Sequence, residues 1–313
     1  MSQIDITVLK EGMHSERILS VSFFTMNDPY RDFTKYQKYL VRFFDMAKIL
    51  PDFQVRVYTD DTGSEFALKA AADNDQVSVY HFDCPEFRDG KGHVGVFGPM
   101  VRFLPLFEKH EIVWISDIDV REWFLDPEFL KQMIKNQCDF SISTFPCYFR
   151  KAFSNKYTII AHRIISRVQL PRALFTRFLT KLASGDLKDK VDLLNAENKG
   201  KPPSRVPYCT DELFLNTSVY KWLSNHDLKF FIEIDYLLIG LLPGASQKLK
   251  KEQELLFYKY GIVRDPKYIP KLSQVFKKIL ELYTKIYPCL KELIPKLNGK
   301  RLFEVQIVNS KDL

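Results

Sequence analysis

The sequence has few of the features that mark disulfide-rich or zinc-binding proteins. Its five cysteines are an odd number in 313 residues, and no two of them form a C-x-x-C pair; they are Cys84, Cys138, Cys147, Cys209 and Cys289. This pattern argues against a disulfide framework and against a cysteine zinc site, and it fits a reducing compartment.

Long hydrophobic runs are also absent. The longest, residues 236–242, is interrupted by Gly240 and followed by Pro243, whereas a membrane-spanning helix needs about 20 apolar residues. Residues 1–16 are polar and lack the apolar core of a signal peptide. We therefore expect a cytoplasmic protein, unless another feature attaches it to a membrane.

The composition is that of a globular chain with an uneven charge. Hydrophobic residues make up 46% and charged residues 27%, which excludes disorder, collagen and coiled coil. The net charge is +7, yet residues 247–301 hold fourteen basic and five acidic side chains and so carry +9, which leaves −2 for the rest. A nearly neutral body argues against nucleic-acid binding. We expect two parts, a domain over residues 1–244 and a basic, amphipathic helical extension over residues 245–313.

Strand and helix patterns alternate along the first half of the chain. Short apolar runs predict strands at residues 18–24, 54–59, 77–82 and 112–115, and apolar residues at helical spacing predict helices at 33–49, 64–72 and 99–109. This order predicts an α/β fold with a Rossmann-like, mostly parallel sheet flanked by helices. Ligands of such sheets bind at the carboxyl ends of the strands, here the loops that start at Thr25, Asp60, Asp83 and Ser116.

A D-x-D motif follows the most hydrophobic of these strands. Asp117 and Asp119 come directly after residues 112–115, and side chains at i and i+2 of an extended chain share a face. Two convergent carboxylates are costly unless a cation offsets them, so the motif indicates a Mg²⁺ or Mn²⁺ site that also holds phosphate oxygens. The alternative is a polar strand end that caps the next helix. Asp73 and Asp75 have the same spacing, but they lie in a polar turn that we interpret as solvated surface.

A glycine pattern is the second local signal. Gly90, Gly92 and Gly95 match the G-x-G-x-x-G spacing of dinucleotide-binding loops. That motif joins the first strand of such a fold to its helix, whereas this one follows the third strand and is itself followed by more loop. We interpret it as a surface loop or as a flexible loop over a ligand.

Two further segments carry charge in apolar surroundings. Arg102 lies within an apolar helix just before the D-x-D strand, so it should meet Asp117, Asp119 or a bound anion. Asp211 and Glu212 follow Thr210, a candidate N-cap. They are either helix-dipole partners or groups that act on a sugar hydroxyl.

In this order, the motifs resemble GT-A glycosyltransferases, above all glycosyltransferase family 8 and the related small enzymes of large DNA viruses and bacteria. That family has an arginine-containing helix, a strand ending in D-x-D and a D-Q-x-x-L-N segment. The corresponding residues here are Arg102 in M-V-R-F, Asp117 and Asp119, and the segment D-E-L-F-L-N from Asp211 to Asn216. The resemblance spans about residues 18–240 and rests on these three short motifs.

The resemblance implies transfer of a sugar from a nucleotide-sugar donor, often UDP-linked, to a glycan or another hydroxyl acceptor. Mn²⁺ (or Mg²⁺) would bridge Asp117 and Asp119 to the diphosphate, with Ile118 between them at the donor. Arg102 would contact the diphosphate or the sugar, and Asp211 and Glu212 would be the catalytic pair. The segment from Thr25 to Tyr30 would hold base and ribose through Thr25, Asn27 and a stacking Tyr30.

The chain also departs from the family. Glu212 stands where the family has glutamine, and the late histidine segment that supplies a third metal ligand is missing. The resemblance favours retention of configuration, although a carboxylate at Glu212 would also suit inversion.

Two other functions remain open. Asp117 and Asp119 followed by Val120 also match the D-x-D-x-T/V strand end of haloacid dehalogenase phosphatases, whose first aspartate is the nucleophile. The third possibility is a nucleotide-sugar binding protein that has the same sheet but catalyses no reaction.

The basic extension has two interpretations. Its predicted helix at residues 271–287 either packs on the sheet domain with its lysines in water, or residues 267–301 form a peripheral membrane contact with anionic lipid. With the second interpretation, the protein would be a cytoplasmic, membrane-peripheral transferase; the resemblance also fits a virus-encoded enzyme acting in a host cytoplasm.

Overall fold

The computed structural model describes residues 4–25, 33–120, 122–144, 151–153, 155, 157–198, 202–235 and 303–313. The chain divides into two compact units, and the first comprises residues 1–143, 151–232 and 307–313. The second unit comprises residues 144–150 and 233–306, of which only residue 144, residues 233–235 and residues 303–306 are described. The boundary predicted at residue 244 and the helix predicted at residues 271–287 lie outside the described residues.

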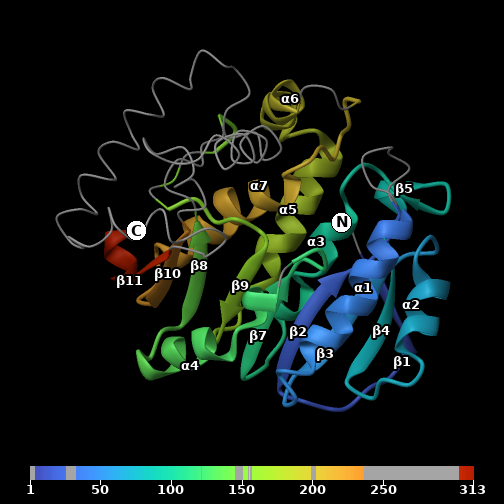
Figure 1. Cartoon of the computed structure of the whole chain (residues 1–313). Coiled ribbons are helices and arrows are strands. Elements are labelled where there is room, and N and C mark those ends of the chain that lie inside the picture. The colour runs from blue at the N-terminus through green and yellow to red at the C-terminus, as the bar shows by residue number, and fades with distance from the viewer. Residues whose placement is uncertain are drawn as a thin grey trace, which may run out of the picture. The chain divides into compact units, whose positions relative to one another are not determined.

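Four parallel strands form the centre of the fold, as the sequence predicts (Figure 1). They are β2 (Arg17–Ser22), β3 (Gln54–Thr59), β4 (Val77–Asp83) and β7 (Ile112–Ser116). Strand β2 pairs in parallel with both β3 and β7, so that Leu19 lies opposite Val55 and Trp114. The order β4-β3-β2-β7 is that of a Rossmann-like sheet.

Further strands extend this sheet to nine, in the order β1-β4-β3-β2-β7-β9-β8-β10-β11. Strand β1 is antiparallel to β4, and β9 is antiparallel to β7 and to β8. The added strands are β1 (Asp5–Lys10), β8 (Phe140–Thr144), β9 (Arg163–Ser166), β10 (Lys229–Asp235) and β11 (Phe303–Asn309). Strand β11 lies in the segment for which we predicted a helical extension, so residues 303–309 of that segment are a strand, which a 3-10 turn follows at Ser310–Asp312.

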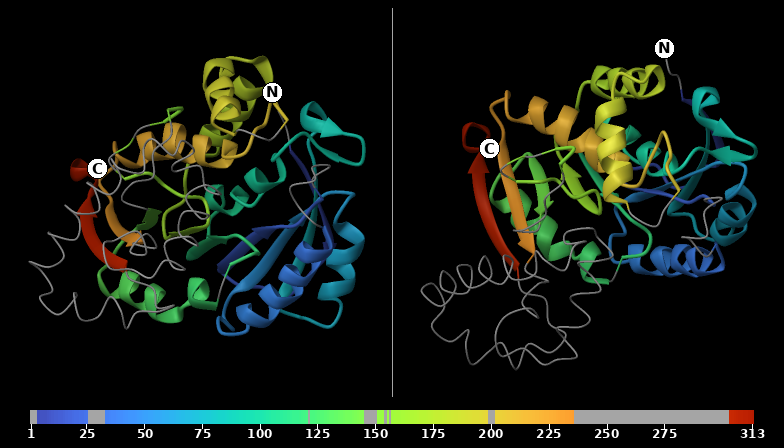
Figure 2. Two further views of the ribbon diagram at one scale, coloured as in Figure 1. Left: turned by 45° about the horizontal axis from the view of Figure 1, so that its top comes forward. Right: turned by 90° about the horizontal axis from the view of Figure 1, so that it is seen from above.

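Helices cover both faces of the parallel strands. Helices α1 (Phe33–Ala47) and α2 (Ser64–Ala71) lie on one face, and α3 (Gly98–Val101) and α5 (Arg172–Ser184) lie on the other (Figure 2). Helix α1 buries Leu40, Phe43 and Phe44. The remaining helices are α4 (Pro127–Lys135), α6 (Lys188–Glu197), α7 (Thr210–Phe214) and α8 (Tyr220–Leu223).

The helix predicted at residues 99–109 is interrupted. Helix α3 ends at Val101, and a 3-10 turn follows at Leu104–Phe107. Pro105 explains the break, because proline has no N–H to donate within a helix and its ring clashes with the preceding turn. The short α3 nevertheless places Arg102 under the carboxyl end of β7.

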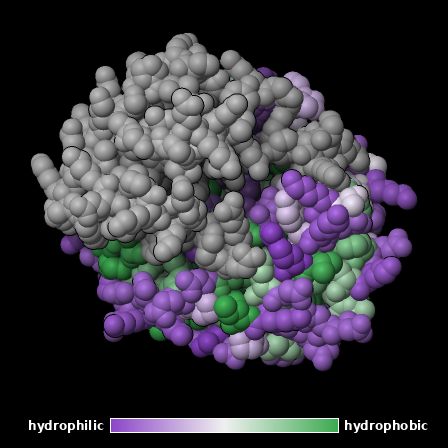
Figure 3. Space-filling model, in the orientation of Figure 1, coloured by the Kyte–Doolittle hydropathy of each residue, from purple (hydrophilic) through white to green (hydrophobic). Residues whose placement is uncertain are grey.

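The central strands are buried along almost their whole length. All five residues of β7 and the last five of β2 are buried, as continuous apolar runs of parallel strands require. The face shown in Figure 3 is largely hydrophilic where it is described, with hydrophobic side chains scattered between polar ones. In the described part of the chain, no helix combines the length and hydropathy that crossing a membrane requires.

Candidate active site at the carboxyl edge of the sheet

The D-x-D motif lies at the carboxyl end of β7. Its aspartates alternate in burial with their apolar neighbours: Asp117 is half-buried and Asp119 exposed, whereas Ile118 and Val120 are buried. This alternation anchors the motif through the apolar side chains and turns the two carboxylates away from the core. The convergence of the two carboxylates on one point stays a prediction.

Helix α1 reaches the same motif, which the sequence did not reveal. The Tyr36 hydroxyl donates to Asp119 Oδ2 at 3.2 Å, and Arg42 Nη2 donates to the carbonyl of Val120 at 2.5 Å. Tyr36 is one of the residues at helical spacing in the helix predicted at 33–49; its ring is half-buried, and its hydroxyl is used by the motif.

Arg102 contacts two of the other predicted site residues. Its side chain is nearly fully buried; Nη1 donates to Asp117 Oδ1, and Nη2 donates to Asp211 Oδ2 at 3.1 Å. Nη2 also donates to the carbonyl of Ala161 at 2.8 Å. The prediction that this arginine meets the aspartates is confirmed for Asp117, and Asp211 is a second partner 109 residues away in sequence.

Asp211 and Glu212 begin the short helix α7. Both are buried, and Asp211 Oδ1 accepts a hydrogen bond from the backbone N–H of Glu212 at 3.0 Å. We predicted Thr210 as the N-cap, but the N-cap is Cys209. Thr210 is the first helical residue, and its hydroxyl donates to the carbonyl of Pro207 at 2.6 Å.

Asn216, the last residue of the D-E-L-F-L-N segment, has a structural role. Its Nδ2 donates to the carbonyls of Glu212 and Ile159, and its Oδ1 accepts from the N–H of Ile159, all at 2.8 Å. These bonds fix the first turn of α7 to the segment before β9. Asn216 thereby holds Asp211 and Glu212 where Arg102 can reach the first of them.

The backbone around α7 is unusual on both sides. Cys209 is left-handed, with φ = 72°, which costs a non-glycine residue about 1–2 kcal/mol. A π-helical turn, Leu215–Val219, follows α7. Strained residues and π-bulges both cluster at functional sites, which agrees with a functional use of Asp211 and Glu212.

The glycine pattern forms a hairpin. Strands β5 (Arg88–Asp89) and β6 (Gly92–His93) pair antiparallel. Gly95 has φ = 54°, and a Cβ there would collide with the carbonyl oxygen of Val206. The glycines therefore serve a turn and a close contact, in a hairpin that lies between β4 and α3.

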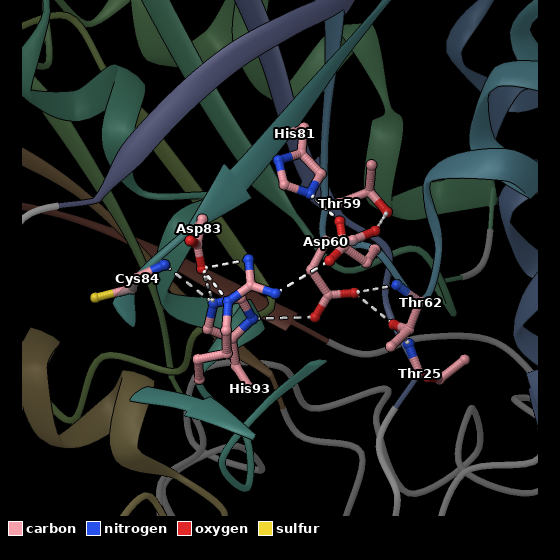
Figure 4. Close-up of polar contacts among 10 residues, drawn as sticks. Thr25, Thr59, Asp60, Thr62, His81, Asp83, Cys84 and His93 are labelled. Atoms are coloured by element: carbon pink, nitrogen blue, oxygen red, sulfur yellow. Dashed lines mark hydrogen bonds and ion pairs between the residues drawn. The ribbon is translucent and has the colours of Figure 1, made fainter. Parts of the chain in front are cut away.

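A second polar cluster lies at the ends of β3 and β4 (Figure 4). On its outer side, Arg88 donates from Nε to Asp83 Oδ1 at 2.8 Å and from Nη1 to Asp61 Oδ2 at 3.1 Å. His81 Nε2 lies 2.7 Å from Asp61 Oδ1. The hydrogen bonds from Arg88 lower the pKa of both carboxyl groups below the usual range. On its inner side, the side chains of Asp60 and His93 are buried, and His93 Nδ1 lies 3.1 Å from Asp60 Oδ2.

The D-x-D residues fit a divalent cation in the kind of ligand they offer. Among the described residues, no group of three or more His, Cys, Asp and Glu side chains could hold a metal ion. Two carboxylates suit a cation that takes its remaining ligands from phosphate oxygens and water. Of the residues predicted to bind the donor base and ribose, Thr25 follows the end of β2 by three residues, whereas Asn27 and Tyr30 lie outside the described residues.

Comparison with known proteins gives little further identification. Neither a protein-family model nor a curated protein matches the chain. A solved structure of 4-diphosphocytidyl-2C-methyl-D-erythritol synthase from Anaerococcus prevotii is similar over 56% of this chain and 83% of its own, at 11% identity and a TM-score of 0.33. A likeness of this degree identifies no family, so the α/β fold rests on the sheet itself and the function on the site.

Proposed function

We propose that the protein is a metal-dependent glycosyltransferase that moves a sugar from a nucleotide-sugar donor, UDP-linked by resemblance, to a glycan or another hydroxyl acceptor. The observation that carries this proposal is the convergence of Arg102, Asp117 and Asp211. Asp211 lies 109 residues from Arg102 in sequence, and each of the three was singled out from the sequence for the same reaction. They meet at the carboxyl edge of a Rossmann-like sheet, where such folds bind their ligands.

The charges of the site suit a diphosphate. Arg102 compensates two carboxylates at once, and its side chain is only 5% exposed. Such a buried fork holds Asp117 and Asp211 in a fixed relation before any ligand arrives. Mn²⁺ or Mg²⁺ held by Asp117 and Asp119 would supply the positive charge that the leaving diphosphate needs.

The roles of the protein side chains follow from their burial. Asp211 is buried and paired with Arg102, so we assign it to binding a donor-sugar hydroxyl. Glu212 is its buried neighbour and the residue that would act near the anomeric carbon. Ile118 holds the D-x-D backbone to the core, and Tyr36 holds Asp119. Retention remains the course that we propose.

The proposal also includes where in the cell the enzyme acts. A cytoplasmic enzyme agrees with the residue pattern, and the membrane contact proposed for residues 267–301 lies outside the described residues. Sedimentation with anionic liposomes, compared between the full chain and one that ends at Gly244, tests this contact. Equal sedimentation of both proteins would contradict it.

A donor screen tests the proposed reaction. UDP-, GDP- and CMP-sugars are added with and without Mn²⁺, and melting temperature and donor hydrolysis are measured. A ligand that binds only the folded state raises the free energy of unfolding by RT ln(1 + [L]/Kd), so we expect one nucleotide class to raise the melting temperature when Mn²⁺ is present. No shift with any nucleotide-sugar, together with turnover of simple phosphate esters, would favour the phosphatase instead.

A further inference from the structure

The inner side of the cluster at the ends of β3 and β4 is a directed chain of hydrogen bonds. The backbone N–H of Cys84 donates to His93 Nε2 at 3.1 Å. Since Nε2 accepts, the ring proton lies on Nδ1, which donates to Asp60 Oδ2 at 3.1 Å. Asp83 Oδ1 also lies 3.4 Å from Nε2, but this contact would be a hydrogen bond only with a charged ring, and Arg88 already satisfies that oxygen.

The chain continues from Asp60 to the end of β2. Asp60 Oδ1 accepts from the backbone N–H of Thr62 at 3.0 Å and from its hydroxyl. Because the Thr62 hydroxyl donates its hydrogen bond to the carboxylate, its lone pairs are left to accept, and the backbone N–H of Thr25 donates to it at 2.8 Å. Figure 4 shows this path from His93 through Asp60 and Thr62 to Thr25.

The residues of this chain of hydrogen bonds are buried and closely packed. The side chains of Asp60 and His93 are 1% and 2% exposed, and the His93 ring stacks on Phe97 at 5.3 Å. A Cβ on Gly92 would stand 3.2 Å from Thr62 Cγ2 and 3.5 Å from Asp60 Oδ2. The β5–β6 hairpin is thus pressed against the ends of β2 and β3, and a buried carboxylate with three donors ties the segments together.

None of these residues belongs to the D-x-D site, yet their chain of hydrogen bonds ends on Thr25, which we predicted to bind the donor. We propose that Thr62, Asp60 and His93 are positioning residues for Thr25, so that nucleotide affinity depends on them although none of them contacts the nucleotide. This inference rests on the proposed function, in which Thr25 begins the segment that holds base and ribose. It adds a requirement that the sequence motifs do not contain, namely that the hairpin must be docked for the donor to bind.

Thr62 offers the sharpest test. Thr62→Val keeps the shape of the side chain but removes the hydroxyl that accepts from Thr25, while Asp60 keeps the N–H of Thr62 and His93 as donors. Thr62→Ser keeps the hydroxyl and is the matched control. Two quantities are measured: the Kd of UDP with Mn²⁺ by calorimetry, and the hydrogen exchange of the Thr25 amide.

We expect Thr62→Val to raise the Kd of UDP about tenfold, because an affinity falls with the fraction of molecules in the competent conformation. The Thr25 amide should exchange at least tenfold faster, and Thr62→Ser should resemble the wild type in both measurements. His93→Leu, compared with the donor-retaining His93→Asn, gives a second pair in case Thr62→Val does not fold.

The outcomes separate this inference from the proposed function. If the wild type binds UDP and Thr62→Val or His93→Leu binds it equally well, the positioning role is overturned and the transferase proposal stands. Equal weakening in Thr62→Val and Thr62→Ser also overturns the positioning role, because Thr62→Ser keeps the hydroxyl that accepts from Thr25. If the wild type binds no nucleotide, the proposed function fails, and the positioning of a nucleotide fails with it.

Discussion

Arg102 shows how a single buried side chain organises the site. It is the described partner of both Asp117 and Asp211, and removing it would leave two carboxylates close together without their cation. Breaking a buried ion pair by removing one partner typically costs about 3–5 kcal/mol. Since Asp117 is about a third exposed, we expect the lower end of that range.

We therefore predict that Arg102→Leu lowers the free energy of unfolding by about 3 kcal/mol. Arg17→Leu is the matched control, because Arg17 makes a two-point contact with Glu111 on the surface, where such pairs contribute less than about 1 kcal/mol. Urea unfolding of both variants measures the difference. Equal losses would mean that Arg102 is no more important than a surface arginine.

Glu108 couples stability to pH. Burial opposes its ionisation, but hydrogen bonds from His110 and Arg56 outweigh that effect and hold the pKa of Glu108 below its ordinary value of 4.5. A depressed carboxyl pKa stabilises the fold above the unfolded pKa, and this contribution disappears as the pH falls through the folded pKa.

The prediction is that Glu108→Gln destabilises the protein more at pH 7 than at pH 3. Because the carboxylate is 37% exposed, we expect a difference below about 1 kcal/mol. Urea unfolding of wild type and variant at both pH values measures it. A difference that is the same at pH 3 and pH 7 would show that the charge of Glu108 contributes nothing.

A single glycine follows the last residue of helix α5. This C-cap residue, Gly185, is left-handed with φ = 86°, and a Cβ there would meet nothing within 4 Å. Only the backbone conformation therefore resists substitution. We predict that Gly185→Ala costs about 1 kcal/mol and that Gly185→Asn costs less, because asparagine tolerates this region better. Thermal unfolding of the two variants measures the difference, and no loss for alanine would contradict it.

The elements also show which parts of the fold are predictable from sequence. Strands β2, β3, β4 and β7 were predicted because buried parallel strands are short, continuous apolar runs. Strand β1 was missed because an exposed edge strand lacks such a run; Ile6 and Val8 are among its exposed side chains. Strand β9 was missed because its four residues lie within an aromatic and basic stretch of mixed helical periodicity.

The residues of the proposed site also divide into those that the sequence predicts and those that it does not. Asp117 and Asp119 were predictable because they are neighbours in sequence and directly follow a strand. Arg102 was predictable because arginine is seldom buried without an anion, but its pairing with Asp211 depends on the fold. The loops that start at Thr25 and Asp60 were predicted to line the site, but the contacts of Tyr36 with Asp119 and of His93 with Asp60 could not be predicted, because each joins residues far apart in sequence.

At the scale of the whole molecule, charge and function are separated along the chain. The excess of basic residues lies at 247–301, outside the described residues, whereas every residue of the proposed site lies in the first compact unit. The remaining chain has a net charge of −2. Because that remainder has no positive excess, attraction of a nucleotide diphosphate must come from a local cation. Arg102 is already paired with Asp117 and Asp211, so this cation is the proposed metal ion.

Calorimetric titration of UDP with and without Mn²⁺, in the wild type and in Asp119→Asn, tests the central claim most directly. Asp75→Asn is the control, because Asp75 belongs to a D-x-D of the same spacing that is exposed in a turn. We predict that Mn²⁺ tightens UDP binding at least tenfold in the wild type and in Asp75→Asn, and that Asp119→Asn abolishes this gain. UDP binding that ignores Mn²⁺, or that Asp119→Asn leaves unchanged, would contradict the account.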